Sequence, residues 1–168
     1  MAKYLALISG VNTEVSGLTT SAGAGDAGKI PQLDSSGRLD QTLMPVGIGA
    51  ETASVIASEA LTAGNLVNIW SNAGTPNVRK ADASNGRIAH GFVLANVSAS
   101  ANATVYFEGT VTGLTGLTPG ARQFLSATTP GLTTESVPAT AGQYVQRVGT
   151  AASTTSFTFN PLDEVLLA

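Results

Sequence analysis

Short apolar runs separated by turn-forming segments occupy the chain from about residue 46 to its end. The separators are rich in Gly, Pro, Asn, Asp and Thr, which favour turns because they adopt positive φ angles, fix φ, or bond their own backbone. In chain order they read TAGN, SNAGTPN, DASNGR, TGLTPGA, TTPGLTT and TAGQ. Hardly any helical periodicity lies between these turns, so the pattern predicts a mainly β fold, a compact antiparallel β-barrel or β-sandwich.

Alternation of apolar and polar residues indicates half-buried strands within these runs. In SFTFN, for example, Phe157 and Phe159 share one face while Thr158 points away, so the two rings are expected in the core rather than in a ligand cage. A helix over 50–60 is an alternative, but its β-branched residues favour a strand. The runs expected to form strands are 54–57, 66–70, 78–81, 88–94, 104–108, 122–126, 144–148 and 157–160.

The first part of the chain, residues 1–45, has a different character. After one expected strand at 4–8, its apolar residues are sparse and follow neither the period of a helix nor that of a sustained strand. Ordering a residue costs about 1–2 kcal/mol of backbone entropy, which this segment cannot recover by packing against itself. We therefore expect an extended N-terminal arm, disordered or laid on another surface, followed by a β-barrel domain at 46–168.

Composition limits the partners. Charged residues make up 11% of the chain, well below the roughly 25% usual for soluble proteins, so part of the surface is expected to be covered by a partner. Only Arg79 and Lys80 are adjacent basic residues, which argues against nucleic-acid binding. Cysteine is absent, so disulfides and thiolate sites are excluded. The apolar run at the N-terminus is too short for a signal-peptide core, and none has membrane-spanning length, so we expect a soluble protein without a membrane partner.

The stretch GAGDAGKI, residues 23–30, satisfies G-x-G-x-x-G and most of a Walker-type pattern. A phosphate loop needs a helix directly after it, because the helix N-terminus supplies the donors that bind the anion. Ile30 occupies the position of the magnesium-binding hydroxyl, and Pro31 biases the residue before it away from helix. We therefore interpret the stretch as a pliable glycine-rich segment rather than a phosphate site.

No catalytic constellation emerges. The single histidine, His90, has no serine in a strained nucleophile setting to act with, and it is expected to be a packed or hydrogen-bonded strand residue near a barrel rim. One histidine without cysteine leaves too few ligands for zinc. Asp34 with Gly37, and Asp82 with Gly86, fit turns in which the carboxylate bonds the backbone ahead and the glycine takes a positive φ. We predict a protein that is not an enzyme and that uses no cofactor or metal.

Two segments resemble a known family. TSAGAGDAGKIPQLDSSGRLDQTLMP is similar to a connector near the start of many tailed-bacteriophage virion proteins. The downstream runs VRKADASNGRIAHGFVL, VYFEGTVTGLTGLTPGARQFLSATTPGLTT, YVQRVGTA and FTFNP are similar to β-barrel modules of phage capsid decoration (cement) proteins and fibre-like proteins. The resemblance implies a barrel presented outward on the virion capsid and an arm that grips the major capsid protein. It also implies a homo-oligomer, most often a trimer, made in the cytoplasm of the host bacterium.

On this reading the chain is a structural virion protein that stabilises the capsid by clamping neighbouring capsid subunits. The alternative is a receptor-binding or adhesin module of a tail or head fibre, in which loops SNAGTPN and TTPGLTT touch a cell-surface glycan. A hydrolase acting on host polysaccharide is a third possibility, because carboxylate pairs can assemble in space. The arm residues expected to contact the capsid or a neighbouring copy are Ile30, Leu33, Leu39, Leu43 and Met44, with Lys29 and Arg38 at the rim.

Overall fold

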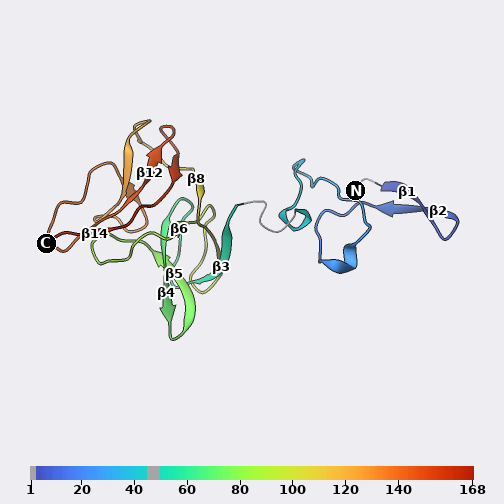
Figure 1. The fold of residues 1–168 in the computed structure, drawn as a ribbon, viewed down its shortest axis with the longest axis horizontal. Helices are drawn as coiled ribbons and strands as arrows, with labels where there is room; N and C mark the ends of the chain where they lie inside the picture. The colour runs from blue at the N-terminus through green and yellow to red at the C-terminus, as the bar shows by residue number, and fades with distance from the viewer. Residues whose placement is uncertain (1–2, 45–49) are drawn as a thin grey trace. The chain divides into compact units, whose positions relative to one another are not determined.

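The computed structural model describes residues 3–44 and 50–168. The chain divides into two compact units, Met1–Gly49 and Ala50–Ala168, each considered by itself (Figure 1). The elements are β-strands and two short 3-10 turns, and no α-helix occurs in the described residues. The prediction of a mainly β fold is therefore confirmed. The boundary expected between 45 and 46 falls outside the described residues.

The first unit begins with a β-hairpin. Strand β1 (Lys3–Ile8) pairs antiparallel with β2 (Val11–Ser16). The two residues between them, Ser9 and Gly10, have φ angles of 52° and 81°, as the two central residues of a type I′ turn require. The sequence predicted a strand at 4–8 but missed β2, because VNTEVS contains only two apolar residues.

The remaining described residues of the first unit, 17–44, form turns and irregular segments. A 3-10 turn, η1 (Ala24–Asp26), lies in the glycine-rich stretch, and a second, η2 (Gln41–Leu43), lies near the end. An isolated parallel bridge joins Leu18 to Pro31. None of the residues from 3 to 44 whose burial is described is buried, so this part of the chain has no core.

The second unit contains a closed five-stranded barrel. Its strands follow the order β3-β5-β4-β6-β7, and every neighbouring pair is antiparallel except β3 and β5, which are parallel. Since β3 pairs with β7 over five positions, the alternative of a helix over 50–60 is wrong. The barrel strands are β3 (Thr52–Ala57), β4 (Leu66–Asn72), β5 (Thr75–Lys80), β6 (Gly91–Phe92) and β7 (Asn102–Tyr106).

A five-stranded antiparallel sheet, in the order β10-β9-β12-β13-β8, completes this unit with a separate two-stranded pair, β11 and β14. Three of the additional strands, β8, β10 and β14, are too short to have been expected from the sequence. The bounds are β8 (Gly109–Val111), β9 (Arg122–Leu125), β10 (Thr133–Thr134), β11 (Tyr144–Val145), β12 (Arg147–Ala151), β13 (Phe157–Phe159) and β14 (Val165–Leu166).

Two hydrophobic clusters share one wall of the barrel. Strand β4 places Leu66 in one cluster and Val67, from its other face, in the second. Phe92 lies in the first cluster, stacked on Tyr106 with ring centroids 5.5 Å apart. The Phe159 ring meets Phe92 edge-on at 5.4 Å, a favoured aromatic geometry. The barrel and the five-stranded sheet therefore pack through a common apolar layer.

Candidate binding surface

The first unit exposes much of its apolar surface. It holds more than half of the exposed large hydrophobic side chains among the described residues, although it is the smaller unit, and it contributes none of the buried hydrophobic ones. An apolar surface that a unit cannot bury against itself marks an interaction site. The exposed side chains are Leu5, Leu7, Ile8, Val11, Ile30, Leu33, Leu39 and Met44.

The glycine-rich loop contains a carboxylate, that of Asp26, which binds the donors of the loop itself. The carboxylate of Asp26 accepts hydrogen bonds from Lys29 Nζ and from the backbone N–H of Ala22, both at 2.6 Å. The hydrogen bond from Lys29, followed by that from Ala22, lowers the pKa of Asp26 below its ordinary value. The only helical element here is the three-residue turn η1. The lysine expected at the rim of the contact surface is thus paired within the loop.

The next residues of the arm are ordered by backbone bonds. Leu18 donates its N–H to the Ile30 carbonyl, and Gln32 donates to the Leu18 carbonyl, both at 2.9 Å. This bridge fixes the backbone on either side of the proline. Ile30 is 51% exposed and Leu33 is 58% exposed, so these two predicted contact residues are available to a partner.

The Asp34 turn forms as the sequence predicted. Asp34 Oδ1 accepts the backbone N–H groups of Ser36 at 2.8 Å and Arg38 at 2.9 Å, and Gly37 has a φ of 72°. The turn leaves the Arg38 side chain exposed. Leu39, directly after it, is 41% exposed.

The final predicted contacts lie at η2. Asp40 starts this turn by accepting the N–H of Thr42 at 2.9 Å and its hydroxyl at 2.6 Å. Leu43 is half-buried, while Met44 is 39% exposed. The seven predicted residues thus follow three successive turns along the arm. Sequence reasoning missed Leu5 and Leu7 of β1, which are 75% and 72% exposed; the signal for their hairpin was the Ser-Gly dipeptide at its turn.

His90 in the second unit has a structural setting. The ring Nδ1 of His90 accepts the backbone N–H of Ile69 at 3.0 Å, and the backbone N–H of His90 donates to the Val67 carbonyl at 2.9 Å. The imidazole thus takes the place of a backbone carbonyl beside β4, which explains why the strand expected from residue 88 begins only at Gly91. Burial lowers the pKa of His90, and Glu164 opposes this effect. The ring therefore favours its neutral form.

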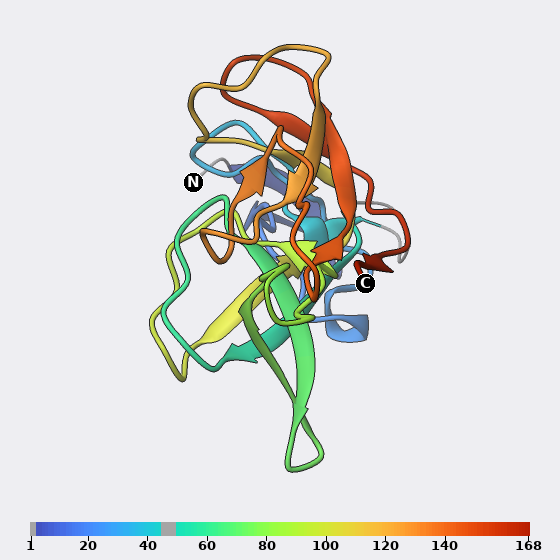
Figure 2. The ribbon, with the colours of Figure 1, turned by 90° about the vertical axis from the view of Figure 1, so that its left-hand side faces the viewer.

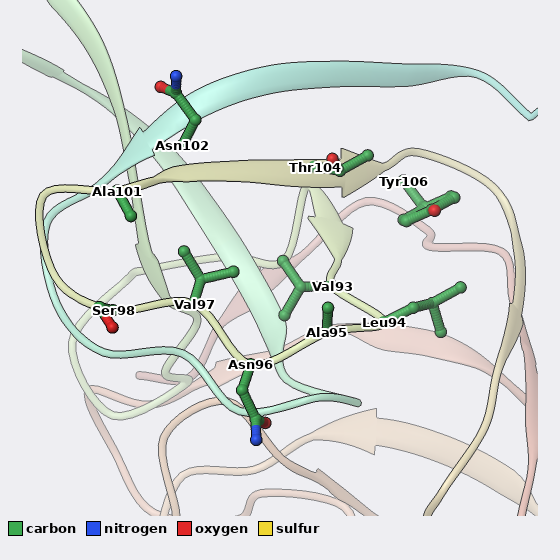
Figure 3. Close-up of a pocket in the computed structure, with 10 residues that line it drawn as sticks. All are labelled: Val93, Leu94, Ala95, Asn96, Val97, Ser98, Ala101, Asn102, Thr104 and Tyr106. Carbon is green, nitrogen blue, oxygen red and sulfur yellow. The ribbon is translucent and has the colours of Figure 1, made fainter. Parts of the chain in front are cut away.

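The second unit also contains open pockets. The one drawn in Figure 3 measures about 590 Å³ and lies between residues 93–98 and β7. The side chains that line it are apolar or carry an amide or hydroxyl group. None of them is a carboxylate, a histidine or a lysine that could act as an acid or base. Within residues 3–44 and 50–168, no three His, Cys, Asp or Glu side chains gather closely enough to hold a metal ion. In the same residues, no helix has the length and apolar character needed to cross a bilayer.

Comparisons with protein-family models, curated proteins and solved structures found no match to this chain.

Proposed function

We propose that this chain is a non-enzymatic structural protein of a phage virion, which binds the outside of the capsid and clamps neighbouring major capsid protein subunits. The supporting observation is the contrast between the two units: Ala50–Ala168 contains two hydrophobic clusters, whereas the described residues of Met1–Gly49 have no buried side chain. The same assignment is supported by the resemblance of the first segment to a connector of tailed-phage virion proteins, and of the downstream runs to β-barrel modules of capsid decoration and fibre-like proteins.

The energetics of the arm favour a partner. Backbone ordering costs about 1–2 kcal/mol per residue, and apolar burial returns about 25 cal/mol per Å². The arm exposes Ile30, Leu33, Leu39 and Met44, and burying them on a capsid would offset part of this cost. A protein that binds the assembled shell and not its separated subunits shifts the assembly equilibrium toward the shell. Clamping therefore needs no catalytic group.

A paired substitution tests the proposal. Leu33→Asp with Leu39→Asp places two charges on the arm at exposed positions, so the fold of either unit is not perturbed. Val137→Asp is the control for an added surface charge outside the arm, because Val137 is 52% exposed and lies in the second unit. Each full-length protein is mixed with phage capsids stripped of it, and the bound fraction is measured by co-sedimentation.

We expect the arm variant to lose at least tenfold in capsid affinity, while Val137→Asp binds like the unsubstituted protein. A tenfold loss corresponds to about 1.4 kcal/mol, the scale of one buried leucine side chain. Undiminished binding of the arm variant, or absence of binding by the unsubstituted protein, would contradict the proposal.

One observation favours the receptor-binding alternative. The β4–β5 hairpin projects from the barrel (Figure 2), and its tip is a two-residue turn with positive φ at Ala73 and Gly74. Along this hairpin the Arg79 guanidinium lies 4.8 Å from the Trp70 ring centre. An aromatic ring beside polar groups can stack on a sugar. If Trp70→Ala abolishes adsorption to host cells without affecting capsid binding, this second role is supported; unchanged adsorption excludes it.

A further inference from the structure

The barrel is closed incompletely between β6 and β7. These strands share a single pair, Phe92 with Tyr106, whereas β7 pairs with β3 over five positions. Beyond Phe92 the chain bends away from β7, and the pocket of about 590 Å³ occupies the opening (Figure 3). The edge of β7 next to this opening therefore has no neighbouring strand over Asn102–Val105 in the described part of the chain.

The backbone groups that face the opening can be identified. Phe107 donates its N–H to the Glu51 carbonyl at 3.0 Å. Backbone groups alternate direction along a strand, so those of residues 101, 103, 105 and 107 face β3, and those of the residues between them face the opening. Tyr106 meets Phe92 there. The N–H and C=O groups of Asn102 and Thr104 are left without a strand partner.

Residues 93–98 form the opposite wall of the opening, and their backbone hydrogen bonds are directed away from β7. Val93 exchanges backbone hydrogen bonds with residues 64–65, and Val97 exchanges them with Leu61. The side chains of Val93 and Val97 point toward β7, and that of Leu94 lies on the same side as Tyr106 (Figure 3). Leu94 is 40% exposed. Val93 is buried in the second hydrophobic cluster with Ala103 and Val105, so Leu94 supplies the exposed apolar surface beside this unpaired strand edge, and such an edge suits an added β-strand.

Strand β1 of the hairpin has the complementary edge. The residues that flank a two-residue turn form a hydrogen-bonded pair, here Ile8 with Val11. Alternation then directs the backbone groups of Leu5 and Leu7 to the free side of β1. A two-stranded hairpin is marginally stable in water, so a third strand on the β1 side would stabilise it.

We propose that β1 of a second copy of this chain adds antiparallel to β7, with Leu5 opposite Thr104 and Leu7 opposite Asn102. Each partner supplies two residues whose N–H and C=O groups lack a strand partner, spaced two positions apart. The pairing places the leucine side chains on the face of Thr104, near Leu94. The arm is therefore exchanged between copies, and the hairpin serves self-association while the turns after it remain open to another partner. This inference does not depend on the capsid proposal.

Cysteine trapping tests the pairing directly, because the natural chain has no cysteine. Leu5→Cys and Thr104→Cys are made in separate full-length chains that carry tags of different size and are co-expressed. Residues in a hydrogen-bonded antiparallel pair have Cα atoms about 5.5 Å apart, within disulfide reach. The control pairs Leu5→Cys with Val137→Cys, another exposed position of the second unit.

Mild oxidation is expected to give a mixed-tag disulfide dimer from Leu5→Cys with Thr104→Cys, in at least fivefold greater yield than from the control pair. Equal yields would overturn the proposal. So would a double variant carrying both cysteines that cross-links only within one chain, because the added strand would then come from the same copy.

Sedimentation velocity gives a second readout. Leu5→Asp with Leu7→Asp is expected to convert the oligomer to monomer at micromolar concentration. Asn12→Asp with Ser16→Asp adds the same charge on β2, away from the β1 edge, and should leave the oligomer intact. An unsubstituted protein that is monomeric, or an oligomer insensitive to the leucine changes, would refute the strand addition; neither result bears on capsid binding.

Discussion

Replacing Gln146 by methionine tests whether its buried amide provides hydrogen bonds that a neighbouring strand would otherwise provide. Gln146 is 3% exposed and lies between β11 and β12. Its Oε1 accepts the Ala89 N–H at 2.8 Å, and its Nε2 donates to the Ala89 carbonyl at 3.0 Å. Methionine has a similar length but no polar amide, so both backbone groups of Ala89, itself 2% exposed, would lose their partner.

Each unsatisfied buried group costs about 1–3 kcal/mol. We therefore expect Gln146→Met to lower the free energy of unfolding by about 2–6 kcal/mol, a large share of the 5–15 kcal/mol or so typical of a domain. Urea unfolding followed by fluorescence measures this change in the second unit, because Trp70 is the only tryptophan.

The matched control is Gln143→Met. Gln143 is half-buried, and its side chain accepts one long hydrogen bond, 3.4 Å, from the Thr140 N–H. We expect the control to lose less than about 1 kcal/mol. Equal losses in the two variants, or a loss below about 1 kcal/mol for Gln146→Met, would refute the argument that its amide completes the backbone pairing of Ala89.

Three further changes have defined outcomes. Burial holds the folded-state pKa of His90 below its ordinary value of 6.5, so the unfolded chain binds this proton more readily. The stability of the second unit should therefore be full above about pH 6.5 and fall as the pH drops below it. Unfolding curves from pH 8 to 5 measure this, and a fall of equal size in His90→Gln would contradict it. Gly149→Ala should destabilise by about 1–3 kcal/mol or more, because its Cβ would overlap the Thr158 carbonyl oxygen, and wild-type urea stability would refute the clash. Phe92→Ala should cost about 3–5 kcal/mol by calorimetry, because this 1% exposed ring joins two other aromatic rings; a loss below about 1 kcal/mol would show that it does not anchor the shared wall.

The elements with clear alternation could be predicted from the sequence. Phe157 and Phe159 are buried with Thr158 exposed between them, as their spacing indicates. The turns at Asp34 and Asp82 form as expected, and Asp82 Oδ1 accepts the Ser84 N–H at 2.9 Å. These features depend on neighbours in sequence, which explains why local patterns were sufficient.

The features that depend on distant contacts could not be predicted. Strand β2 has few apolar residues and forms because it pairs with β1 over six positions. Leu66 and Val67 are both fully buried, since β4 has a hydrophobic cluster on each face, and alternation alone does not reveal a second cluster. The late start of the strand expected over 88–94, at Gly91, follows from the hydrogen bond between His90 and Ile69. The exposed leucines of β1 were missed for the same reason as β2.

The proposed function is that this chain binds a capsid through its coreless arm. The most direct measurement is its copy number in purified virions relative to the major capsid protein, by quantitative mass spectrometry with labelled peptide standards. The proposed function predicts a high copy number in fixed proportion to the shell, which falls when the arm carries Leu33→Asp and Leu39→Asp. A handful of copies per particle, or none, would contradict it.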